Sequence, residues 1–272
     1  MASLLPQVAA AALLLAVCLA VFGALGRLFP CNPGHRLFFS RAIGLDLAYC
    51  ALGVLYAGIG PAVAGLANLA PVRSGPTAGA SAWVAGLPLA WQFTGLMVVT
   101  DFCQYWLHRA LHGRTLWPFH AIHHAAEEVN WTATFRLHPV NHLMVNTSLA
   151  VLARLAGVSE LVLLLAAPVF FFTGALSHAN LGWTYGPLRY VIASPVFHRW
   201  HHVAAPEARD RNYAPMFAVW DVLFGTFRMP RGELPDGYGA PGVPPGLIAQ
   251  LVHPFRRDVR APGAARTADL SR

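Results

Sequence analysis

The sequence contains little charge and no lysine. Charged residues make up 11% of its 272 residues, against roughly 25% in ordinary soluble domains. Hydrophobic residues make up 56%, and the 19 basic residues, all arginine, give a formal net charge of +7. A chain with this balance is suited to a bilayer, with its arginines toward anionic lipid headgroups. We therefore expect a membrane partner and no nucleic acid.

Several metal and redox motifs are also missing. The four cysteines are scattered without a CxxC pair, which excludes a disulfide framework and a cysteine-ligated zinc or iron–sulfur site. HExxH, the zinc protease signature, is absent. The Glu-x-x-His pairs of carboxylate-rich di-iron bundles are absent too. The GxGxxG spacing occurs only at Gly237–Gly242, in a Pro/Gly-rich stretch and not between a strand and a helix as a nucleotide fingerprint requires.

Long apolar runs predict an all-α, integral-membrane bundle. The first run, Val8–Leu25, has eighteen residues, and as a helix it is about 27 Å long, close to the ~30 Å hydrocarbon core of a bilayer. A cleaved signal peptide is the alternative, but the run lacks a positive segment before it, so a retained helix is favoured. We place spans at 8–25, 42–69 and 82–107, followed by a membrane hairpin at 143–177. These give about four spanning elements.

The arginines predict how this bundle is oriented. The linker between the first two spans carries Arg27, Arg36 and Arg41, whereas the next linker carries only Arg73. The positive-inside rule then makes the first linker cytoplasmic. Three regions result: a transmembrane region at 1–107, a catalytic region at 108–230 that includes the hairpin, and a C-terminal tail at 231–272. Every clustered histidine then falls on the cytoplasmic face, under a helical cap.

Histidines form three clusters, one HxxxH and two HxxHH. Residues three or four apart share one face of a helix, so the imidazoles of each cluster project together. Neutral imidazole is a common metal ligand, and eight ligands suit two ions that each keep an open position. A pH-sensing patch would not need this repeated spacing. The predicted ligands are His108, His112, His120, His123, His124, His198, His201 and His202.

Asp101 is the acidic residue that the apolar pattern makes most conspicuous. It lies seven residues before His108, two turns earlier on the same helical face. A carboxylate within an apolar span is costly unless it has a function. We expect it to accept a hydrogen bond from the N–H of an imidazole ligand. The alternative is a residue near a helix end that reaches the headgroups.

The ordered motifs resemble the fatty acid hydroxylase/sterol desaturase superfamily of integral-membrane, histidine-box di-iron oxygenases, and within it the sterol desaturase branch. The resemblance extends over about Ala82–Met229. Asn141 stands where that branch often has glutamate, and Ala214 stands where glycine is usual. The matching segments are Asp101–His112, Phe135–Pro139, Ser177–Asn180, Ser194–His202, Asn212–Tyr213 and Trp220–Thr226.

This resemblance implies two iron ions, O2 as co-substrate, and the hydroxylation or desaturation of a sterol-like or fatty acyl lipid. It adds His178 as a ninth metal ligand and makes His138, Asn180 and Asp221 supporting residues. Because the chain shows no redox cofactor motif, electrons are expected from an external donor of ferredoxin or cytochrome type. The expected location is a bacterial inner membrane.

Two other functions use the same histidines. A zinc-dependent membrane hydrolase would activate water and would need neither O2 nor reductant. A non-enzymatic membrane metal-binding protein would carry or sense an ion. A carrier predicts ligands deep within the spans, whereas these clusters lie at one face.

Overall fold

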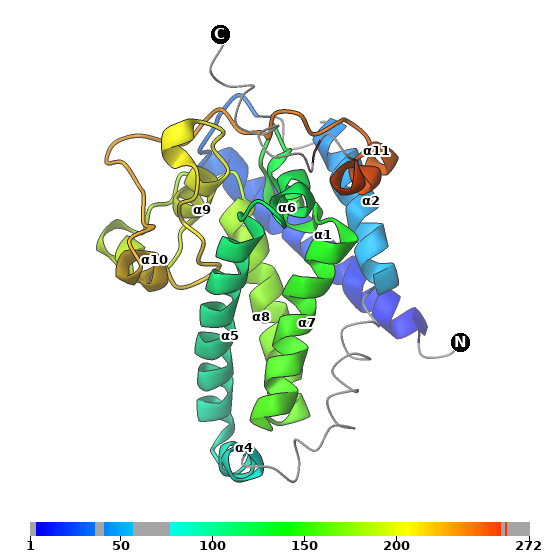
Figure 1. Cartoon of the computed structure of the whole chain (residues 1–272), viewed down its shortest axis with the longest axis vertical. Coiled ribbons are helices and arrows are strands. Elements are labelled where there is room, and N and C mark those ends of the chain that lie inside the picture. Colours follow the sequence, from blue (N-terminus) through cyan, green and yellow to red (C-terminus); the bar gives the residue numbers. More distant parts are fainter. Residues whose placement is uncertain (1–3, 36–40, 57–76, 257–258, 260–272) are drawn as a thin grey trace.

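A computed structural model describes residues 4–35, 41–56, 77–256 and 259. The described part is helical, and its one β feature is an isolated bridge between Val203 and Tyr238. The all-α prediction is therefore confirmed. Figure 1 shows two parts. The stem consists of three long helices, α5 (Leu89–Leu111), α7 (Pro139–Ala156) and α8 (Glu160–His178), with the short α4 (Thr77–Ala85) at its lower end. Above it lies a cap of short helices and loops, with α1 (Leu4–Leu28) and α2 (Arg41–Tyr56) beside them.

The far end of the stem is a hairpin of two helices. α7, Pro139–Ala156, ends at Gly157, whose φ of 74° is left-handed, and α8, Glu160–His178, begins after the Ser159 cap. A Cβ on Gly157 would lie 2.7 Å from the carbonyl oxygen of Ser81. Both the left-handed backbone and this close approach to α4 require glycine.

The segment of the expected third span, 82–107, comprises parts of two helices. α4, Thr77–Ala85, ends before a turn, and α5, Leu89–Leu111, begins after Pro88. Proline disfavours helical backbone in the residue before it, which stops α4 from continuing into α5. The buried amide of Gln92 donates to the carbonyls of Ala85 and Leu87 at this turn.

The described residues test only part of the span prediction. One helix, α8, is long and apolar enough to cross a membrane, while Ala12–Leu28 and Ala42–Tyr56 are shorter apolar stretches. These two stretches belong to α1, Leu4–Leu28, and α2, Arg41–Tyr56. Residues 57–69 of the expected second span lie outside the described residues.

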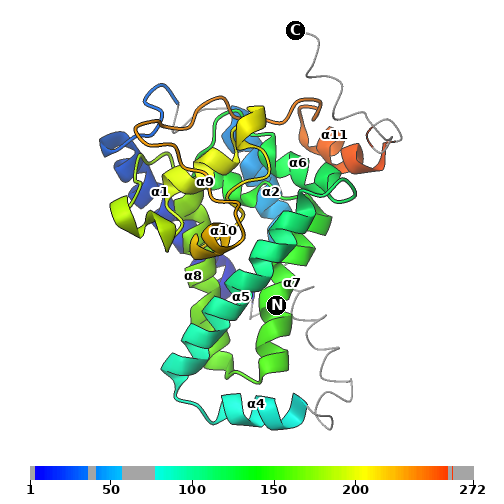
Figure 2. The ribbon, with the colours of Figure 1, turned by 60° about the vertical axis from the view of Figure 1, so that its left-hand side comes forward.

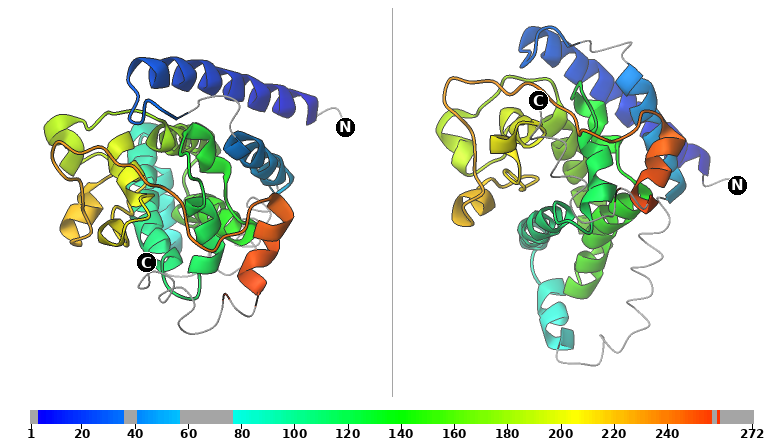
Figure 3. Two further views of the ribbon diagram at one scale, coloured as in Figure 1. Left: turned by 90° about the horizontal axis from the view of Figure 1, so that it is seen from above. Right: turned by 45° about the horizontal axis from the view of Figure 1, so that its top comes forward.

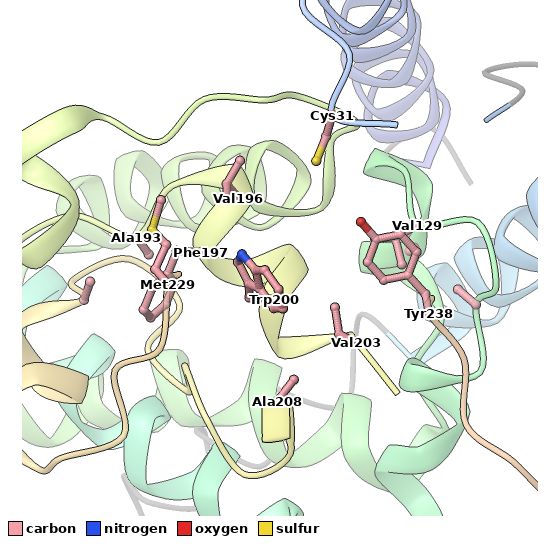
Figure 4. Close-up of a cluster of buried hydrophobic side chains, with 13 residues drawn as sticks. Cys31, Val129, Ala193, Val196, Phe197, Trp200, Val203, Ala208, Met229 and Tyr238 are labelled. Carbon is pink, nitrogen blue, oxygen red and sulfur yellow. The ribbon is translucent and has the colours of Figure 1, made fainter. Parts of the chain in front are cut away.

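The cap covers the end of the stem opposite the turn between α7 and α8 (Figures 2 and 3). Its core contains the fully buried Val196 and Phe197 of α9, with Cys31 joining from the loop after α1 (Figure 4). The elements of the cap are short: α6 at Trp117–His124, η2 at Trp131–Phe135, η3 at Gly186–Tyr190, α9 at Pro195–His201, η4 at Pro206–Ala208, α10 at Val219–Leu223, α11 at Leu247–Val252 and η5 at His253–Phe255.

Two buried polar contacts tie the N-terminal helices to the cap. Asp46 of α2 accepts from Arg136 Nε at 2.6 Å and from the hydroxyl of Thr132 at 2.6 Å. Arg199 of α9, completely buried, donates to the side chain of Asn32 after α1. The cap therefore rests on α1 and α2 as well as on the stem.

Candidate metal centre

Nine histidines converge where the stem meets the cap. They form two groups, and within each the potential ligand atoms all lie within 4.8 Å of one another. The five-histidine group consists of His108, His112, His120, His124 and His201. The four-histidine group consists of His123, His178, His198 and His202. All nine predicted ligands are present, and seven of them are buried, with His108 and His112 partly exposed.

The two HxxHH clusters divide their histidines between the groups in opposite ways. On α6, His120 and His124 join the five-histidine group while His123 joins the other. Consecutive residues on a helix point about 100° apart, so the paired histidines face different groups. At α9 the assignment is reversed: His201 joins the five-histidine group, and His198 and His202 join the four-histidine group. The repeated spacing thus serves two centres from each short helix.

The rings in each group face one another through Nε2. His108 Nδ1 lies 2.7 Å from the Tyr213 carbonyl oxygen, and a carbonyl only accepts, so Nδ1 carries the proton and Nε2 is bare. The side-chain oxygen of Asn141, 2.7 Å from His120 Nδ1, leaves the Nε2 of His120 bare too. These two Nε2 atoms are 3.0 Å apart. Two bare nitrogens cannot hydrogen-bond to each other, but one cation can satisfy both.

The spacing of the nitrogens fits a metal ion with ligands near right angles. Neighbouring Nε2 atoms within the groups are 3.0–3.2 Å apart. Two nitrogens held about 2.1 Å from one ion lie about 3.0 Å apart at a right angle and about 3.4 Å apart at the tetrahedral angle. Nε2 of His112 and of His201 are also buried without a partner in the described part of the chain. The donor set therefore fits two metal ions.

Burial keeps these imidazoles neutral, as metal ligands must be. Desolvation lowers the pKa of His108 to about 4. It lowers the pKa of His120 and His123 well below the ordinary value near 6.5, and the charges of neighbouring imidazoles lower it further. At neutral pH the groups thus present uncharged nitrogens to a cation.

Among the described residues Asp101 hydrogen-bonds to no imidazole, contrary to the sequence prediction. Its carboxylate accepts from the amides of Met216 and Phe217 and from the indole of Trp220, at 2.9–3.0 Å. Met216, Phe217 and Trp220 come shortly after Tyr213 in the chain, so Asp101 holds the segment whose Tyr213 carbonyl accepts from His108. Asp101 therefore supports His108 only through the backbone of this segment.

Asp221 holds the same segment from its other side. It accepts from the amides of Tyr213 and Ala214 at 2.8 Å and from the hydroxyl of Thr226 at 2.6 Å. The Tyr213 carbonyl that orients His108 is thereby fixed between two carboxylates. Asp221 therefore supports His108 indirectly, through the backbone of this segment.

The other two supporting residues bind backbone rather than imidazoles. His138 accepts from Val140 N, which caps α7, and its Nε2 lies 3.2 Å from the Leu251 carbonyl oxygen. Asn180 exchanges two hydrogen bonds of 2.9 Å with the backbone of Asn32. Both residues fix the framework of the site, and in the described region neither hydrogen-bonds to a ligand ring.

Besides the carbonyls of Tyr213 and Gly174, which lie behind His108 and His178, sequence reasoning missed three partners of the predicted ligands. They are the side chain of Asn141, the Arg211 carbonyl 2.7 Å from His201 Nδ1, and the carboxylate of Asp210 3.3 Å from His112 Nδ1. Asp210 and Asn212 both have a left-handed φ of 57°, which Asp and Asn adopt more readily than most residues. These two residues flank Arg211 in the sequence, and this pattern was the one available signal that the loop folds sharply.

The comparisons with known proteins point to one family. The model of the family "Fatty acid hydroxylase" matches residues 93–226, which include all nine histidines. The chain is 33% identical over 180 residues to ornithine lipid hydroxylase OlsE of Rhizobium tropici, covering 65% of this chain and 54% of that protein. It is 32% identical over 151 residues to alkylglycerol monooxygenase of Caenorhabditis elegans, covering 55% of this chain and 29% of that protein.

A plant relative extends this set. Very-long-chain aldehyde decarbonylase GL1-6 of Oryza sativa subsp. indica is 30% identical over 164 residues, covering 53% of this chain and 25% of that protein. The chain spans about half the length of these curated relatives or less, and no solved structure matches it significantly. The predicted superfamily is confirmed, whereas its sterol desaturase branch stays a prediction. The segment 93–226, which contains all nine histidines, therefore belongs to the fatty acid hydroxylase family.

Proposed function

We propose that this protein is a membrane-bound di-iron oxidoreductase that hydroxylates or desaturates a lipid with O2 and external electrons. The observation that carries the proposal is the pair of histidine groups, in which Nε2 atoms face one another at 3.0–3.2 Å. The named relatives act, by their names, on an ornithine lipid, an alkylglycerol and a very-long-chain aldehyde. A lipid substrate is the class common to them.

The choice of iron rests on geometry as well as on the family. Zinc in proteins is usually tetrahedral and binds imidazole more tightly than ferrous iron, so ligand type alone would favour zinc. The right-angle spacing of the nitrogens instead favours an ion with five or six ligands. Two iron ions bound there would supply the activation of O2 needed to remove hydrogen from an unactivated carbon. The chain's part is to hold neutral, pre-oriented imidazoles.

The proposed membrane placement follows the surface of the stem. Leu164 and Trp91 are 69% and 67% exposed, and α8 is apolar along its length. Exposed apolar side chains on helices suit a lipid environment, where the helix satisfies its own backbone. We place about four spanning elements in a bacterial inner membrane, with the cap and both histidine groups on the cytoplasmic face.

Electrons are proposed to come from a separate ferredoxin or cytochrome that docks on the cap. Arg211 and Arg231 of the cap have exposed side chains. An acidic donor would be attracted to exposed arginines of this kind. Arg231→Glu tests the idea, since it should slow reduction by a ferredoxin without changing reduction by dithionite, and it leaves Arg211, whose carbonyl orients His201, intact.

The principal test compares metal content with turnover. Protein purified in detergent and loaded anaerobically with Fe²⁺ should hold about two ions per chain, and His123→Ala should lower iron content and abolish product. His142→Ala is the matched control, because this α7 histidine belongs to neither group. Full activity in metal-free protein would refute the proposal. Activity that persists without O2 or reductant would favour the zinc hydrolase instead.

The reaction itself can be read from lipids. Extracts of cells with and without the protein should differ by lipids that have gained one oxygen, which indicates hydroxylation, or lost two hydrogens, which indicates desaturation. The identity of the changed lipids also gives the class of substrate, and so distinguishes a sterol-like from a fatty acyl lipid. Identical extracts under inducing conditions would contradict a lipid substrate.

A further inference from the structure

In the five-histidine group, most rings have an oxygen partner at Nδ1, the nitrogen that points away from the proposed metal. Nδ1 of His108, His120 and His201 each lie 2.7 Å from an oxygen of Tyr213, Asn141 and Arg211, respectively. A fourth ring, that of His112, has its Nδ1 3.3 Å from the carboxylate of Asp210. Four of the five rings in this group thus have an oxygen partner on the side away from the proposed metal.

The four-histidine group lacks most of this support. His178 Nδ1 lies 2.7 Å from the Gly174 carbonyl oxygen. Nδ1 of His123, His198 and His202 is buried in each case, with no hydrogen-bond partner in the described part of the chain. In three of the four rings, therefore, no hydrogen bond at Nδ1 fixes which nitrogen carries the proton. Packing alone sets the orientation of these rings.

An oxygen behind the ring strengthens metal binding in two ways. It places the ring proton on Nδ1, so that Nε2 need not lose a proton or change tautomer when the ion arrives. It also makes Nε2 more basic and fixes the angle of the ring. Losing such a partner typically lowers metal affinity by about 10–100-fold. The five-histidine group has both more donors and more of these partners.

We propose that the two groups bind metal with unequal strength, the five-histidine group first and more tightly, and that Asn141 is a positioning residue for this tighter site. The inference rests on the metal binding of the proposed function and is independent of the lipid and the reaction. It predicts a range of conditions in which the protein holds one ion rather than two.

Asn141 is the buried side chain on which this difference can be tested. It is 0% exposed on α7, and its Oδ1 meets His120 Nδ1. Leucine has a similar size but no acceptor, so Asn141→Leu removes the partner with little change in volume. Aspartate keeps the acceptor, so Asn141→Asp should restore what leucine loses. Asn146→Leu is the matched control, because Asn146 is exposed on the same helix.

The experiment is a metal titration of the full metal-free chain in detergent micelles. Co²⁺ is added anaerobically and followed by its visible absorption, and the bound metal is counted after gel filtration. The wild type should bind in two steps that differ by at least about 10-fold in affinity. Asn141→Leu should weaken the first step by about 10–100-fold and leave the second unchanged. Asn141→Asp and Asn146→Leu should behave as the wild type.

A second variant guards against misfolding of the first. Asp210 is exposed and has a left-handed φ, so Asp210→Gly removes the carboxylate behind His112 without straining the backbone. It too should weaken only the first step. Two ions bound with equal affinity, or variants that weaken the second step, would overturn the inference while leaving the proposed function intact. A wild-type protein that binds no metal would overturn both.

Discussion

Leu164 on the stem is 69% exposed, whereas Arg199 in the cap is completely buried. The same contrast holds between Trp91 on the stem, which is 67% exposed, and Asn212 and Asp221 in the cap, which are 0% exposed. A stem helix satisfies its backbone within itself, so its side chains can be apolar on all sides. The cap is made of short turns whose backbone groups need other partners. Its buried polar side chains supply them.

The largest expected effect is a loss of stability in acid, once metal has been removed from the buried histidines. Burial lowers the pKa of the clustered histidines, that of His108 to about 4, so the unfolded chain binds more protons below pH 6.5. Stability should be constant above about pH 6.5 and fall as the pH drops toward 4. Thermal unfolding in micelles, followed by circular dichroism, measures it. Metal-loaded protein should resist the fall to lower pH, and equal acid sensitivity would contradict metal binding.

Replacing Asp221 by alanine should have the next largest effect. The substitution leaves the amides of Tyr213 and Ala214 and the hydroxyl of Thr226 without their acceptor. A buried donor left unpaired costs about 1–3 kcal/mol, so we expect a loss of about 4 kcal/mol in unfolding free energy. Denaturant unfolding measures it, and Asp221→Asn should retain part of the stability. A loss below about 1 kcal/mol would mean that the segment is held by other contacts.

Two leucine-to-alanine substitutions, one in the cap and one on the stem, should differ in their effect on stability, with the smallest effect expected on the stem. Leu181 of the cap is 0% exposed within a hydrophobic cluster, so Leu181→Ala should cost about 2–5 kcal/mol. Leu164→Ala on the stem should change stability by less than about 0.5 kcal/mol in detergent. Both variants are compared by their melting temperatures under identical conditions. Equal losses would mean that the exposed face of α8 is covered by another part of the protein.

The sequence was most informative where the geometry is local. Helical spacing predicted that His120, His123 and His124 lie near one another, because one short helix carries all three, but it did not predict that His123 joins the other group. It could not predict the partners of Asp101, since Met216 and Phe217 are more than a hundred residues away and meet it only through the packing of α10 on α5. The break at Pro88 was readable as a Gly-Leu-Pro turn, but apolar composition alone had joined the two helices.

The division of each HxxHH cluster between two groups limits how the sequence can vary. In the printed sequence His123 and His124 look interchangeable, as do His201 and His202. In space each neighbour serves a different centre. Neither histidine of a doublet can replace the other, and deleting one residue within it would misdirect ligands of both centres at once. The apparent redundancy is therefore absent, and the doublets should tolerate sequence change less than any other part of the cap.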